Sequence, residues 1–198
     1  PRESQTLQEK RMKKTAVGLA FAALTGSALA AESFTIDPNH TWPYFAINHL
    51  GFSTQHGRFN KTSGKITLDR SARKGSVEVT IDTGSIDMGL DKWDAHMKDE
   101  DFFNVAAFPT MTFKSDKFVF DGDKPVAAEG TLTLLGVTKP VRLEIRKFNC
   151  GANPITKKPL CAADLGAVIK RSEWGMTKYV PAVSDLVQLN IPIEAYKD

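Results

Sequence analysis

The sequence predicts an all-β domain of antiparallel strands, folded either as a closed barrel or as a two-sheet sandwich. Apolar and polar residues alternate along several segments, which is the period of a half-buried strand. Turn-forming residues separate these segments, and together they give roughly eight to ten short strands in one domain. Few stretches show the 3.6-residue period of a long helix.

The first 30 residues are expected to be absent from the mature protein. Met12 starts a segment with two lysines and an apolar run that ends Ala28-Leu29-Ala30, the order of a secretory signal peptide. The apolar run is shorter than the about 20 residues of a membrane-spanning helix. We therefore predict export to the periplasm, residues 1–11 as upstream sequence, and one domain over residues 31–198 without a stable membrane anchor.

The charge of the predicted mature domain is balanced. Of 26 basic and 23 acidic residues, five basic and two acidic lie in residues 1–30, which leaves 21 of each sign in residues 31–198. A chain with balanced, scattered charges has no basic patch that could follow a phosphate backbone, so nucleic acid is excluded as a partner. Polybasic attachment to a membrane surface is excluded for the same reason.

The strands follow from period and turns. Alternation predicts strands over residues 65–69, 76–82, 141–148 and 186–196. Pro192 has no N–H and indicates an edge, or a break in the ladder, near the last strand. Composition and turns predict the remaining strands, at residues 34–36, 43–50, 110–115, 117–120 and 127–135.

One insertion, near residues 91–108, breaks the alternation. Asp91 to Lys98 is predicted as a short helix, and aromatic residues follow it. A barrel of about eight strands is wide enough to hold one small ligand. The insertion therefore closes or lines the mouth of a cavity, or it packs a core beneath a long connection; composition alone leaves both open.

Two cysteines, Cys150 and Cys161, lie close together in an exported chain, which predicts a structural disulfide. The alternative, a metal-binding pair, needs two further ligands, and none lie nearby. His96 and Glu100 share a helix face, but a charge contact accounts for that spacing without metal. No Gly-x-Ser-x-Gly elbow or haem attachment motif is present, so neither a catalytic residue nor a metal site is predicted.

Five segments together resemble the YceI family of secreted or periplasmic proteins. They are FAINHLG (45–51), GRFNKTSGKI (57–66), HMKDEDFFNVAAFPTMTFKS (96–115), GTLTLLGVTKPVRL (130–143) and RSEWGM (171–176). The resemblance implies a lipocalin-like antiparallel β-barrel over nearly the whole mature chain. It also implies an apolar cavity that takes up a polyisoprenoid lipid, such as an isoprenoid quinone, in place of a conventional cofactor.

Apolar alternation then supplies candidate cavity walls. The predicted ligand-binding residues are Phe45, Ile47, His49, Phe59, Met97, Phe102, Phe103, Phe108, Phe113, Leu132, Leu134, Leu143 and Trp174. His49 lies on an apolar face, where it either bonds a head group or is a core histidine bonded to backbone. Arg171 is interpreted as tying a turn through backbone carbonyls or stacking on Trp174.

The predicted function is a non-covalent lipid carrier rather than an enzyme. Two alternatives stay open: an enzyme that acts on a lipid-like substrate through His49, and a filled barrel that binds a partner protein. A homodimer that shields the barrel mouth is also compatible with the sequence.

Overall fold

The computed structural model describes residues 31–198, so the predicted signal peptide and the start at Met12 lie outside the described residues. Within that part, antiparallel strands dominate, with one α-helix and two short 3₁₀ helices. The strands are β1 (Glu32–Ile36), β2 (Tyr44–His49), β3 (Ser53–Phe59), β4 (Thr62–Asp69), β5 (Lys74–Asp82), β6 (Ile86–Asp87), β7 (Thr110–Asp121), β8 (Lys124–Leu134), β9 (Val137–Ala152), β10 (Pro159–Lys170) and β11 (Val183–Lys197). The helices are η1 (Thr83–Ser85), α1 (Asp91–Lys98) and η2 (Arg171–Trp174).

Eight of these strands form a closed ring. Their order is β1-β4-β5-β7-β8-β9-β10-β11, and β1 pairs with β11 through the register Phe34↔Lys197 to Ile36↔Ala195. This pairing joins the first and last strands of the described chain and leaves no free edge in the ring. The lipocalin-like barrel is therefore confirmed, and the sandwich is not formed.

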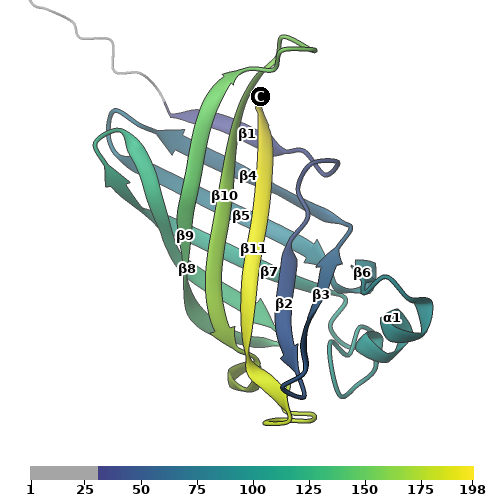
Figure 1. Ribbon diagram of the computed structural model, residues 1–198. Helices are drawn as coiled ribbons and strands as arrows, with labels where there is room; N and C mark the ends of the chain where they lie inside the picture. Colours follow the sequence, from purple (N-terminus) through teal and green to yellow (C-terminus); the bar gives the residue numbers. More distant parts are fainter. Residues whose placement is uncertain (1–30) are drawn as a thin grey trace, which may run out of the picture.

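Strand β11 has two partners along one edge. Its first half pairs with β2, ending at Asn190↔Tyr44, and its second half pairs with β1, beginning at Ala195↔Ile36. Pro192 lies between these two ladders, where no N–H is needed on that side, so the predicted break in the ladder is confirmed. Figure 1 shows the β2–β3 hairpin beside the first half of β11, with β6 and α1 beyond it.

The corner between β1 and β2 is held by a buried side chain. The Thr41 hydroxyl accepts from the Glu194 N–H at 3.1 Å and donates to the Glu194 carbonyl at 3.3 Å. The Asp37 N–H also donates to that carbonyl, at 2.9 Å. The Thr41 hydroxyl thus bonds the N–H and the carbonyl of Glu194 at the point where β11 changes its partner from β2 to β1.

Two apolar clusters lie inside the barrel. The smaller one lies where β1 closes the ring and contains Phe34, Ile36, Leu68, Ile193 and Ala195. The larger one gathers aromatic and aliphatic residues from β2, β3, β7, β8, β9 and β11 with the insertion after α1. The smaller cluster therefore packs the end that β1 closes.

The predicted disulfide is confirmed. Cys150 of β9 and Cys161 of β10 are directly opposite each other in the ladder and are bonded, with their Cα atoms 4.1 Å apart. The bond ties the long β9–β10 hairpin near its tip. It lies away from the larger apolar cluster, which is consistent with a structural role.

Candidate ligand cavity

The larger cluster encloses a cavity of about 330 Å³. One water molecule occupies about 30 Å³ of liquid, and small-molecule pockets span about 300–1,000 Å³. The walls come from the faces of β2, β3, β5 and β7 to β11, together with α1, the loop after it and the loop before β11. The alternative of a filled barrel is therefore wrong, because the hollow is far larger than a water-sized void.

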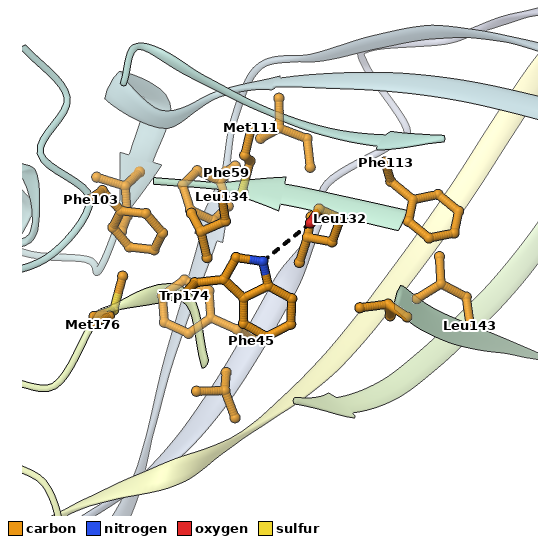
Figure 2. Packing of buried hydrophobic residues seen from close by; sticks show 14 of the residues in the cluster. Phe45, Phe59, Phe103, Met111, Phe113, Leu132, Leu134, Leu143, Trp174 and Met176 are labelled. Carbon is orange, nitrogen blue, oxygen red and sulfur yellow. Dashed lines mark hydrogen bonds between the residues drawn. The ribbon is translucent and has the colours of Figure 1, made fainter. Parts of the chain in front are cut away.

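Eleven of the thirteen predicted ligand-binding residues line this cavity. They are Phe45, Ile47, His49, Phe59, Met97, Phe102, Phe103, Phe113, Leu132, Leu134 and Leu143. Those labelled in Figure 2 converge from β2, β3, β7, β8, β9 and the segment after α1. Contact between any of them and a ligand stays a prediction.

Trp174 and Phe108 lie elsewhere, which corrects two of the predicted wall positions. Trp174 is 2% exposed and is packed as solid core, with its indole Nε1–H donating to the Leu132 carbonyl at 3.2 Å (Figure 2). Phe108 packs its ring over Gly136 at the β8–β9 turn, while its carbonyl accepts from the Thr83 hydroxyl at 2.7 Å. Both aromatics anchor chain segments instead of facing the hollow.

Other wall residues escaped the sequence analysis. Val187, Leu189 and Ile191 of β11 form an alternating face that could have been nominated with the others. Met176 and Tyr179 come from the irregular loop before β11, and Met88 follows β6. No period marks residues in such segments, so only the fold reveals them. Trp93 also lines the cavity, as expected for the insertion, although it was not among the thirteen predicted ligand-binding residues.

Polar groups at the cavity are few. His49, Gln55 and His96 are among the lining residues. The His49 ring forms no hydrogen bond with another residue of the described chain, so the interpretation as a core histidine bonded to backbone fails. Gln55 is turned to the hydroxyl of Ser53 at 2.8 Å. A ligand group with hydrogen-bonding capacity would find His49 unengaged.

Arg171 fixes the loop that forms one side of the cavity. Its guanidinium donates to the carbonyls of Met176, Lys178, Val183 and Ser184 at 2.8–3.1 Å, and the residue is only 4% exposed. Burial lowers the pKa of this guanidinium from its ordinary value. The interpretation that Arg171 ties a turn through backbone carbonyls is therefore confirmed. A planar group with five donors is well suited to hold four carbonyls together.

Titratable side chains gather mainly outside the cavity. Asp37, His40 and Glu194 meet at the β1–β2 corner, where the His40 Nδ1 lies 2.7 Å from an Asp37 carboxyl oxygen. The hydrogen bond that the His40 ring donates to the Asp37 carboxylate raises the pKa of His40, as expected for an ion pair. His96 does not pair with Glu100 as the helical spacing suggested; its Nδ1 lies 3.6 Å from Asp99, and its ring meets Phe102 edge-on.

A closed eight-stranded antiparallel ring around an apolar hollow defines a lipocalin-like barrel. The chain belongs to the YceI family: the family described as YceI-like domain matches residues 34–195. It is 38% identical over 189 residues to Protein YceI of Salmonella agona, covering 92% of this chain and 97% of that protein. Protein YceI of Salmonella arizonae is 37% identical over the same shares.

Solved structures show the same fold. The Campylobacter jejuni YCEI protein is 28% identical, with a TM-score of 0.66 over 76% of this chain and 90% of that chain. Burkholderia cenocepacia BcnA is 23% identical, with a TM-score of 0.68 over 80% and 98%. A polyisoprenoid binding domain from Saccharophagus degradans, implicated in plant cell wall breakdown, is 15% identical, with a TM-score of 0.63 over 84% and 99%. The family resemblance stated from the sequence is thus confirmed.

Proposed function

We propose that this chain binds a polyisoprenoid lipid, such as an isoprenoid quinone, non-covalently in the barrel cavity, and serves as its carrier in the periplasm. The observation that carries the proposal is the cavity of about 330 Å³ with an almost wholly apolar wall. Each CH₂ group left in water costs about 0.8 kcal/mol, so a prenyl tail is nearly insoluble in an aqueous compartment. A deep apolar hollow removes that cost.

The composition of the wall supports a lipid over a polar metabolite. Aromatic rings such as Phe45, Phe59 and Phe113 supply large, stiff apolar surfaces that lose little conformational entropy on contact. Specificity in such sites rests on a few polar groups that fix the orientation of the ligand. His49 is the side chain that we assign to the head group, since its ring is free to bond a carbonyl or hydroxyl oxygen.

The relatives and the fold are compatible with this proposal, but the proposal does not rest on them. The likeness to the polyisoprenoid binding domain of Saccharophagus degradans concerns the fold alone. Among residues 31–198, none of the helices combines the length and apolar character needed to cross a membrane. The proposal assigns no covalent step to the chain, and periplasmic location rests on the predicted signal peptide.

Native mass spectrometry tests the proposal. The mature chain, purified from the periplasm, is expected to carry one lipid per molecule, and organic extraction should release a prenyl-tailed species. Ubiquinone-10 added to the delipidated protein should quench the fluorescence of Trp93, which lines the cavity, more than that of buried Trp174. In Trp93→Phe the quenching should shrink while the mass stoichiometry stays. A lipid-free mass together with no uptake of ubiquinone or a polyprenyl alcohol would overturn the proposal.

A further inference from the structure

One wall of the cavity is held much less firmly than the others. Helix α1 has no buried residue, and Leu90 at its N-terminus provides no side-chain cap. Trp93, His96 and Met97 of this helix nevertheless line the cavity, and Trp93 is 40% exposed. Met97 also packs against the edge of the larger cluster, and the His96 ring meets Phe102, but none of the three side chains is buried. Segments with few buried contacts open locally at low free energy, so α1 is the part of the wall that separates most readily.

The opposite side of the cavity is rigid by comparison. The loop of residues 175–182 also lines the hollow, through Met176 and Tyr179. The four carbonyl bonds of Arg171 hold this loop, and Asp185 accepts from the Ser172 N–H and hydroxyl at 2.8 and 2.7 Å. The loop of residues 175–182 is therefore the rigid side of the cavity, and α1 is the side that can move relative to it.

Two contacts join these sides. The Lys178 ammonium lies 2.9 Å from the Asp101 carboxylate, with both side chains about half exposed. Next to this ion pair, the rings of Phe102 and Tyr179 lie with centroids 6.2 Å apart. An exposed ion pair contributes little to stability and breaks easily, which suits a reversible closure better than a permanent brace.

A glycine stands at the start of the weakly held segment. Gly89 has a φ of +79°, a left-handed conformation that suits glycine, and its N–H donates to the Asp87 carboxylate at 2.9 Å. Before it, β6 is fixed by the pairing of Asp87 with Arg58. Beyond the segment, Thr83 bonds the carbonyls of Phe108 and Pro109. Motion is therefore confined to the residues between these two anchors.

We propose that α1 and residues 99–102 form a gate, closed against the loop of residues 175–182 by the Asp101–Lys178 and Phe102–Tyr179 contacts, through which lipid enters and leaves the cavity. The gate rests on the proposed lipid-binding function. It assigns the path of uptake to the α1 side of the barrel and assigns control of the exchange rate to an ion pair outside the cavity wall.

Charge reversal tests the gate. The probe is NBD-labelled geranylgeraniol, with its release followed by transfer to excess vesicles of phosphatidylcholine. Lys178→Glu places two carboxylates opposite each other, so release should quicken about fivefold or more. The double variant Asp101→Lys/Lys178→Glu restores attraction and should return the rate to within twofold of the parent. Lys114→Glu is the matched control, because it also places two carboxylates opposite each other, at the Lys114–Glu78 ion pair on the outer barrel face. It should leave the release rate unchanged.

Cross-linking provides a second measurement that does not depend on the strength of one ion pair. Asp101→Cys/Lys178→Cys, joined by a reducible bis-methanethiosulfonate reagent, should slow both uptake and release at least tenfold, with recovery on reduction. The control Arg70→Cys/Asp123→Cys replaces an ion pair between the β4–β5 and β7–β8 turns and should exchange at the parent rate.

The outcomes separate the gate from the function beneath it. If the parent binds the probe and the cross-linked protein exchanges it at the parent rate, the gate is wrong and the carrier function stands. If the parent takes up no prenyl probe at all, the proposed function fails and the gate falls with it. The gate is supported if lipid exchange slows in cross-linked Asp101→Cys/Lys178→Cys and not in cross-linked Arg70→Cys/Asp123→Cys.

Discussion

The indole N–H of Trp174 donates to the carbonyl of Leu132 at 3.2 Å, joining two segments 42 residues apart in the chain. Trp174 belongs to η2, and Leu132 belongs to β8, with its side chain on the cavity wall. The bond therefore fixes the main chain at Leu132, whose side chain lines the cavity, although Trp174 is not itself a lining residue. Figure 2 shows Trp174 at the centre of the packed residues around it.

Trp174→Phe removes this bond and keeps most of the aromatic bulk. The Leu132 carbonyl is left without its indole donor, so the free energy of unfolding should fall by about 1–3 kcal/mol. Chemical denaturation followed by circular dichroism measures the change. Trp93→Phe, at a half-exposed site, is the control and should shift the midpoint little. Equal shifts in the two variants would show that the bond contributes nothing specific.

Phe103→Ala separates cavity wall from solid core. Phe103 meets Phe59 edge-on at 5.2 Å between centroids and also borders the hollow. The variant should lose ligand affinity at least tenfold, with less destabilisation than the about 3–5 kcal/mol of a fully packed phenylalanine. Phe34→Ala, in the smaller cluster, is the matched control. Its free energy of unfolding should fall by the full amount for a packed phenylalanine, while its lipid affinity stays that of the parent. Unchanged binding in Phe103→Ala would contradict the wall assignment.

Removal of the disulfide should affect stability alone. The chain-entropy model gives about 3 kcal/mol for a loop this short, with Cys150 and Cys161 separated by 11 positions. Cys150→Ser/Cys161→Ser should approach that loss in thermal or urea unfolding while lipid release stays within twofold of the parent. In the parent, alkylation under denaturing, non-reducing conditions should label neither cysteine.

Acid should loosen the base of the insertion through Asp87. Hydrogen bonds from the Asn60 side chain, the Gly89 N–H and Arg58 lower the pKa of this carboxyl, with Asn60 the strongest. A lowered folded-state pKa stabilises the fold above the unfolded value of about 3.9 and loses that contribution as pH falls through the folded-state pKa. Stability measured from pH 7 to pH 2 should therefore differ between parent and Asp87→Asn above pH 4, and the two curves should converge below it. Parallel curves throughout would contradict the role of Asp87.

The sequence predicts local features of the fold well. Alternation identifies β4, β5, β9 and β11, whereas β3 was not predicted. The helix is correctly bounded at Asp91 and Lys98, and Pro192 marks the change of partner in β11. These features depend on neighbouring residues, whose spacing is visible in one dimension. The closure of β1 on β11 is not visible in the spacing, because it depends on contacts between residues more than 150 positions apart.

The predicted wall residues lie mostly on strands, together with Met97, Phe102 and Phe103 of the insertion. Phe113 and Leu143 face inward as alternation requires, whereas Trp174 and Phe108 sit in irregular segments where an aromatic residue can pack in any direction. Tyr179 and Met176 were missed for the same reason. Their positions depend on Arg171, whose hydrogen bonds shape the loop only in the folded chain.

The division of β11 between two neighbours makes the barrel modular. The β1–β11 pairing closes the eight-membered ring, and the β2–β3 hairpin pairs with the other half of β11 and supplies Phe45, Ile47, His49 and Phe59 to the cavity. Sequence changes in the hairpin can therefore reshape the chamber while the hydrogen-bonded scaffold stays whole. Replacing β2 and β3 with the corresponding hairpin of a relative should therefore give the barrel the ligand preference of that relative.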